Sequence, residues 1–232
     1  MSLILSGTDG LSDVDGSAAT PAIRGTDANT GIFFGTDIIG FSEGGVEAAR
    51  INADSQFVAA AGTAALPVIT TTGDTNTGIF FPAADTIAFA EGGAEVARFN
   101  SSGNFGLGAT PSSWGAGTSV IDLATSGNAG AVSASGTLSI ANNGFFNGTD
   151  WIYKNTSSAL LYQLISNQHR WSIAASGTAG NAITFTQAMT LDASGRLLVG
   201  STSSIGNCNA QFNDANGQSA LFNSSSASGS YV

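Results

Sequence analysis

Charged side chains are scarce in this chain of 232 residues, in which Asp, Glu, Lys and Arg together make up 9%. An ordinary soluble domain contains about 25% of them. Long exposed helices are built largely from such residues, so the sequence predicts few or none. Sixteen acidic residues against six basic ones give a net charge of −10. Because nucleic-acid binding requires a basic surface, this composition excludes nucleic acid as a partner.

Cysteine and histidine occur once each, as Cys208 and His169. A lone cysteine excludes an intramolecular disulfide. One cysteine and one histidine also supply too few residues to favour a zinc site or a catalytic Cys–His pair. A Ser-His-Asp triad would need His169 as its base, yet no Gly-x-Ser-x-Gly motif frames a serine. Glycine-rich nucleotide-binding motifs between a strand and a helix are also missing. We therefore expect no cofactor, no metal and no enzymatic activity.

Long apolar runs are missing as well. The longest fall well short of the ~20 residues that a membrane helix needs, so we expect no membrane insertion. Residues 1–7 have neither the basic region nor the long apolar core of a secretory signal. We expect synthesis in a reducing cytoplasm.

What the sequence does contain is an internal repeat. The stretch from Asp74 to Asn100 has a near-copy from Asp27 to Asn52. Both copies contain Asn-Thr-Gly-Ile-Phe-Phe, then Glu-Gly-Gly, then a glutamate and an arginine three residues apart. Self-similarity at a fixed spacing is typical of a protein that extends along one axis, with each unit contacting its neighbours.

Each copy predicts about four short strands joined by glycine turns. Asn-Thr-Gly reads as a turn in which Gly31 and Gly78 are free to take positive φ, and Glu-Gly-Gly reads as a hairpin turn. Residues 74–78 begin like a calcium-binding loop but lack its closing glutamate, so we interpret them as a turn.

Alternation along the predicted strands places large apolar side chains on one face, with Arg50 and Arg98 on the other. A unit of this size cannot bury such a face alone, so it needs neighbours along the axis or from other chains. We expect these residues to form the core of a trimer: Ile32, Phe34, Ile39, Phe41, Ile79, Phe81, Ile87, Phe89, Phe99 and Phe105.

The composition changes after Pro111, and all three tryptophans follow it. Strands are predicted at 137–141, 160–165 and 170–173, and a hairpin at 145–153 with Asn147-Gly148 as its turn. Residues 189–200 restate the end of the second copy, so the repeat continues after a long insertion. The segment 210–232 reads as an incomplete β segment.

Aromatic residues of this middle region are candidates for receptor or glycan contact, because Trp and Tyr rings stack on sugars. The alternative is that they fill a β core. The candidates are Trp114, Trp151, Tyr153 and His169.

Two carboxylate pairs raise the question of glycoside hydrolysis, which uses carboxylates about 5–9.5 Å apart. They are Glu43 with Glu47 and Glu91 with Glu95. Both pairs lie in the repeat beside an arginine, so we interpret them as ion pairs with Arg50 and Arg98.

Residues 76–89, the following Glu-Gly-Gly and residues 98–104 resemble the repeats of tailed-bacteriophage fibre and appendage proteins. Residues 180–195 are similar to a second stretch common in such fibres. The resemblance covers about residues 21–200. The first copy departs from the pattern, with Gly35 in place of the proline and residues 53–56 in place of Ser-Ser-Gly-Asn.

The resemblance implies a homotrimer with intertwined β-strands, located in the virion and used for host attachment. Many such fibres end in an autocleaving chaperone domain of the endosialidase type, and we expect this chain to end before one. Its partners would be other copies of itself, a baseplate or tail-hub protein contacted through residues 1–20, and a host-surface glycan or receptor.

Together these observations predict an all-β, elongated, intertwined trimeric fibre of short-strand repeats, similar to a β-helix or β-prism. We expect an anchoring arm at 1–20, repeats at 21–66 and 67–110, an aromatic-rich region at 111–209 and the final segment at 210–232. The alternatives are a head or collar fibre, a non-viral carbohydrate-binding adhesin module, and, third, a polysaccharide-cleaving enzyme.

Overall fold

The computed structural model describes residues 15–123, 128–133, 136–204, 210–213 and 219–222. Their regular secondary structure is entirely β-strand, joined by turns and irregular connections, without any helix. The all-β expectation is therefore confirmed for this part of the chain. Residues 1–14 of the expected anchoring arm, Cys208 and most of the expected final segment lie outside the described residues. No described helix is long and apolar enough to cross a membrane.

The strands form two sheets and a separate hairpin. The smaller sheet follows chain order and contains β1 (Ile23–Arg24), β2 (Gly31–Gly35), β3 (Ile38–Glu43), β4 (Val46–Ile51) and β5 (Phe57–Ala59). The larger sheet begins with β6 (Ile69–Thr71), β7 (Asp74–Phe80), β8 (Ile87–Glu91), β9 (Ala94–Phe99), β10 (Phe105–Leu107), β11 (Thr118–Leu123), β12 (Asn128–Ser133) and β13 (Leu138–Asn142). It continues with β16 (Ser157–Ile165), β17 (Gln168–Gly177), β18 (Thr186–Leu191), β19 (Leu197–Val199), β20 (Ala210–Asn213) and β21 (Ser219–Phe222). The hairpin consists of β14 (Gly144–Phe146) and β15 (Trp151–Tyr153).

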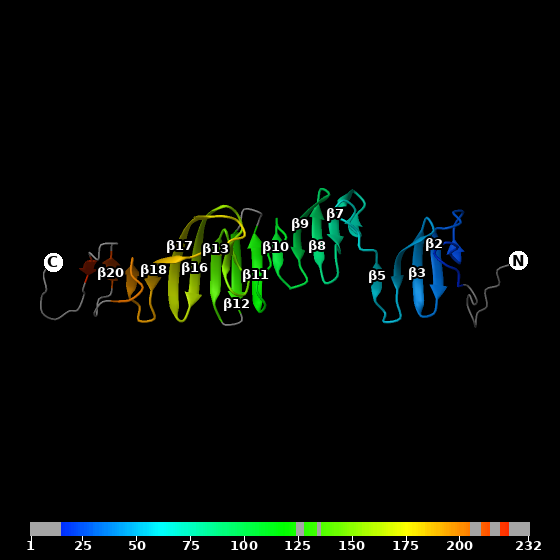
Figure 1. The fold of residues 1–232 in the computed structure, drawn as a ribbon. Coiled ribbons are helices and arrows are strands. Elements are labelled where there is room, and N and C mark those ends of the chain that lie inside the picture. Colours follow the sequence, from blue (N-terminus) through cyan, green and yellow to red (C-terminus); the bar gives the residue numbers. More distant parts are fainter. Residues whose placement is uncertain (1–14, 124–127, 134–135, 205–209, 214–218, 223–232) are drawn as a thin grey trace.

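The strands lie side by side across the long axis of the molecule, with β2 near one end and β20 near the other (Figure 1). Most neighbouring pairs are antiparallel, and the exceptions in the described sheets are β10 with β11 and β19 with β20. Since strand order follows chain order apart from the β14–β15 hairpin, the fold is a linear array in which each strand contacts its sequence neighbours.

The two copies of the repeat fold alike from Gly31 and Gly78 onward, and the segments 15–20 and 61–66 correspond. The starts of the copies differ, because residues 28–29 lie in a turn whereas residues 74–77 belong to β7. Backbone hydrogen bonds join Ser17 to Thr20 before the first copy and Thr63 to Leu66 before the second. The amide of Phe34 then donates to the carbonyl of Asp15, as the amide of Phe81 donates to that of Ala61. Residues 15–20 therefore contact the first copy as 61–66 contact the second.

Corresponding turns also follow residues 52, 100 and 192. The amide of Asn52 donates to the carbonyl of Gln56 at 3.0 Å, and the amide of Asp192 donates to that of Arg196 at 2.9 Å. The backbone near residue 192 therefore forms the same turn as the ends of the two copies, as expected from the similarity of residues 189–200 to the end of the second copy. The differing residues 53–56 do not prevent the first copy from forming this turn.

The prediction that Gly31 and Gly78 adopt positive φ is wrong, because neither does. A Cβ on Gly31 would lie 2.2 Å from the carbonyl oxygen of Ile23, and one on Gly78 would lie 2.0 Å from that of Ile69. These glycines are needed because the neighbouring strand approaches closely. The turn predicted at residues 74–78 is also wrong, since they belong to β7 and the Thr70 hydroxyl donates to the carbonyls of Asp74 and Thr77.

One face of the larger sheet is covered by the chain's own connections, and we call it the covered face. Its strand positions hold small residues, including Ala88, Ala129 and Ala141, which are at most 3% exposed. Ala64 of the β5–β6 connection packs on Phe80, Ala88 and Ala90. Further along, Trp114 and the β14–β15 hairpin pack over Val120 and Ala129. Small side chains thus let connecting segments lie directly on the sheet.

Candidate functional site

The opposite face of the larger sheet bears large apolar side chains, and we call it the open face. Residues that are paired across neighbouring strands point to the same face, so the register defines rows that cross the whole sheet. The first row is Ile87, Phe99, Phe105, Ile121, Gly130, Ile140, Tyr162, Trp171, Met189 and Val199.

Two shorter rows flank the first at two-residue spacing. On one side lie Ile69, Ile79, Phe89, Ala97, Leu107 and Leu123, and further along Leu160 and Ile173. On the other side lie Leu138, Leu164, His169, Leu191, Leu197 and Ala210. The smaller sheet has equivalent rows, in which Ile32 faces Phe41 and Phe34 faces Ile39.

Large side chains of the open face remain substantially exposed in the single chain. Ile121, Ile140 and Leu160 are each 54% exposed, and Phe99 is 44% exposed. The three rows contain no Asp, Glu, Lys or Arg. A surface that is apolar, uncharged and this long is typical of a protein–protein contact.

Of the residues expected in the trimer core, six lie on this face and four lie in the equivalent rows of the smaller sheet. Nine of the ten occupy paired positions in the rows of the two sheets, and Phe81 follows the end of β7 and is 38% exposed. Phe80 points the other way and is 4% exposed within the chain's own core. The alternation in the sequence thus predicted which residues share a face.

Two apolar hollows of about 650 and 660 Å³ lie on the open face. Ile121, Gly130 and Ile140 line both hollows, so they meet at β12. Leu160, Tyr162 and Trp171 line the first, and Phe99 and Phe105 line the second. No charged residue lines either one.

The expected receptor contacts occupy different places. Trp114 and Tyr153 are 8% and 7% exposed and belong to the core of the covered face. Trp151 is half-buried, edge-on to Trp114 at 6.0 Å. His169 lies on the open face, where Nδ1 shares a 2.7 Å hydrogen bond with the Tyr162 hydroxyl and the ring stacks on Trp171. The structure does not bring these four residues together in one surface site.

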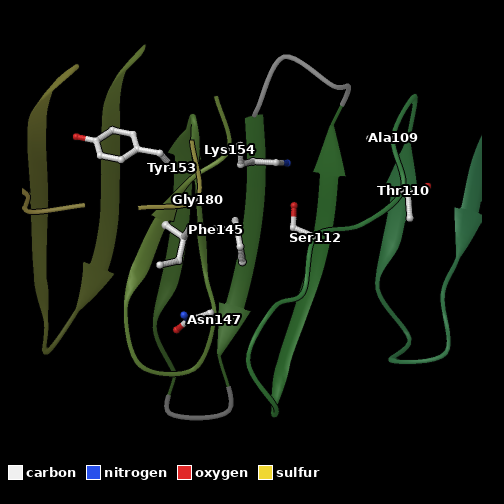
Figure 2. Close-up of a pocket in the computed structure, with 9 residues that line it drawn as sticks. Ala109, Thr110, Ser112, Phe145, Asn147, Tyr153, Lys154 and Gly180 are labelled. Atoms are coloured by element: carbon white, nitrogen blue, oxygen red, sulfur yellow. The ribbon is translucent and has the colours of Figure 1, made fainter. Parts of the chain in front are cut away.

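A groove of about 750 Å³ on the covered face lies between the β14–β15 hairpin and the segment after β10 (Figure 2). Lys154 extends from the hairpin toward the segment that carries Ser112 (Figure 2), and its Nζ forms an ion pair with Oδ1 of Asp122. Asn147 Oδ1 accepts the amides of Thr149 and Asp150 at 2.9 and 2.8 Å. Asn147 Oδ1 and Lys154 Nζ thus already bond within the chain, and neither is left free for a ligand.

Asp122 is the most deeply buried charge described, with 0% exposure. Besides Lys154 it has two donors on Oδ2, the amide of Ser112 at 3.0 Å and the indole Nε1 of Trp114 at 3.2 Å. Sequence reasoning missed this cluster, because its members lie far apart in the chain. The only signal was an aspartate in an apolar strand.

One carboxylate of each pair in the repeat forms the expected ion pair with the arginine, and the ion pairs between described residues do not include Glu43 or Glu91. Glu47 pairs with Arg50 at 2.7 Å, and Glu95 with Arg98. The hydrogen bond from Arg98 to Glu95 raises the pKa of Arg98. Burial acts to raise the pKa of Asp192, but hydrogen bonds from the Arg196 amide, the Arg196 side chain and the Ser194 amide outweigh burial and lower it. Within the described residues, no cluster of His, Cys, Asp or Glu could hold a metal ion.

Comparisons with protein-family models, curated proteins and solved structures gave no match for this chain.

Proposed function

We propose that this chain is a structural protein of a tailed-bacteriophage virion, a tail fibre that forms a homotrimer and mediates host attachment. The observation that carries the proposal is the open face, an uncharged apolar surface that runs along a single-layered array of strands. A sheet with an apolar face needs a second layer against it. Three copies around a common axis would form a three-sided prism with the open faces inside.

The size of the open face supports self-association. A large apolar side chain has roughly 150 Å² or more to bury. Ten of those on this face are 38–54% exposed: Ile69, Phe81, Ile87, Phe99, Leu107, Ile121, Leu123, Ile140, Leu160 and Ile173. These ten side chains alone therefore present on the order of 700 Å² of apolar surface per chain. A stable interface needs about 800 Å² per partner. The open face extends along the larger sheet, and the smaller sheet has equivalent rows, so a partner of equal length and equal strand spacing, such as another copy, fits it well.

Assignment to a phage virion rests on the sequence resemblance, and the linear array supports it over the alternatives. An adhesin module that binds sugar needs a concave site with free polar groups, and in the described groove Asn147 and Lys154 are already bonded. A glycosidase needs two free carboxylates, and Glu47 and Glu95 are paired with arginines.

The experiment is the solution mass of the purified chain by light scattering, with its shape from small-angle scattering. We expect a rod with three times the chain mass of 23.1 kDa. A compact monomer would overturn the proposal. Antibodies against the purified rod should then label the tail of the intact phage, and labelling of the head or collar would favour the alternative position.

A further inference from the structure

Gly130 is a glycine that the fold of the single chain does not explain. It lies within β12, paired with Ile121 of β11 and Ile140 of β13. Glycine inside a strand is unfavourable, because it loses more backbone entropy on folding and packs no side chain. At other strand positions the structure shows why glycine is needed. At Gly78, for example, a Cβ would lie 2.0 Å from a backbone oxygen.

Neither of the usual reasons applies at Gly130. Its φ is not in the positive region, and a Cβ placed on it would meet no heavy atom within 4 Å. A larger residue would therefore fit the isolated chain. In strands, a glycine of this kind marks a place where a ligand or another chain comes close.

The surroundings of Gly130 point to the same conclusion. It forms the floor where the two apolar hollows of the open face meet, between the side chains of Ile121 and Ile140. Both isoleucines are 54% exposed and stand on either side of the glycine in the same row. The first row is thus recessed at Gly130 and raised at Ile121 and Ile140 on the neighbouring strands.

We infer that Gly130 is a point of close approach between copies of this chain, where apolar side chains of a second copy enter the recess. The inference rests on the proposed function and locates its interface. In a cyclic assembly whose axis follows the rod, equivalent strands lie at the same height. The Gly130 recesses of the copies then lie level with one another, and the isoleucines on the strands above and below can fill the space that the glycines leave. The area of the open face and the absence of charge around the hollows make another copy the occupant that fits.

The test compares Gly130→Leu with Gly73→Leu. Gly73 lies between β6 and β7, outside the rows of the open face, and a Cβ there also meets nothing within 4 Å. Both variants should fold, as checked by far-ultraviolet circular dichroism. We expect Gly130→Leu to weaken association at least tenfold in sedimentation equilibrium, and Gly73→Leu to leave it unchanged. Gly130→Ala, which adds a single methyl group, should weaken it less and serves if the leucine variant misfolds.

The outcomes separate the two claims. A trimeric wild type whose association is equal or stronger in both Gly130 variants overturns the inference and leaves the proposed function standing. Equal weakening by Gly73→Leu also overturns it, since the effect would then not be specific to the recess. A monomeric wild type overturns the proposed function itself.

Discussion

Ser55 occupies a turn position where the two equivalent turns have glycine. Its φ is 61°, against 75° at Gly103 and 77° at Gly195. A residue with a side chain pays roughly 1–2 kcal/mol to adopt this positive φ. About half of that is offset, because serine leaves the unfolded chain with less backbone entropy to lose than glycine does. We therefore expect Ser55→Gly to stabilise the chain by on the order of 0.5 kcal/mol in urea unfolding, and Gly103→Ser to destabilise it by a similar amount. A loss of stability in Ser55→Gly would contradict this.

Gly78 should tolerate no side chain, although its φ is ordinary. A methyl group there would lie 2.0 Å from the carbonyl oxygen of Ile69, which belongs to the paired strand. Relief requires β6 and β7 to separate, so we expect Gly78→Ala to cost about 3 kcal/mol, as overpacked core positions do. Gly25→Ala is the matched control, because a Cβ there meets nothing within 4 Å. Equal melting temperatures for the two variants would refute the backbone contact.

A buried ion pair holds the β14–β15 hairpin against the sheet. Lys154 Nζ contacts Asp122, and the exposed fractions of the two side chains are 11% and 0%. Removing one partner leaves a buried charge, which costs about 3–5 kcal/mol. We therefore expect a loss of that size for Lys154→Met in urea unfolding. The double variant with Asp122→Asn should lose less, because an amide oxygen still accepts the Ser112 amide without carrying a charge. A double variant as unstable as the single one would show that charge is not the cause.

The strands and the faces of their side chains were largely predictable from the sequence, but the segments that cover one face of the sheet were not. Two-residue alternation placed Ile79 and Phe89 on one face and Arg98 on the other, because side-chain direction in a strand is a local property. Which face the chain itself covers depends on connections, and Trp114 reaches Asp122 only because the segment after β10 folds back over the sheet. For the same reason the sequence could not show which of the candidate receptor-contact aromatic residues are exposed, because exposed and buried aromatic residues have the same local sequence pattern.

At the scale of the whole molecule, a single charge on the open face should prevent assembly. Ile140 is 54% exposed in the chain and lies in the first row. If other copies cover it, Ile140→Lys buries an unpaired ammonium group, which is costly. We expect association to weaken more than a hundredfold by light scattering at graded concentrations. Val58→Lys is the control, because Val58 is 37% exposed but pairs with Arg50, away from the open face. An undiminished trimer in Ile140→Lys would remove the open face as the interface.

The charge distribution also fixes the sign of the salt dependence of assembly. Each chain carries −10, so the copies repel one another, and the rows of the open face contain no ion pairs to oppose this. Raising the salt from 0.1 to 1 M shortens the Debye length from about 10 to 3 Å and screens the repulsion. We therefore expect the association constant to stay level or rise over this range, as measured by sedimentation equilibrium at fixed pH. Dissociation at high salt would mean that ion pairs hold the copies together, and the contact would then have to lie among the charged residues outside those rows.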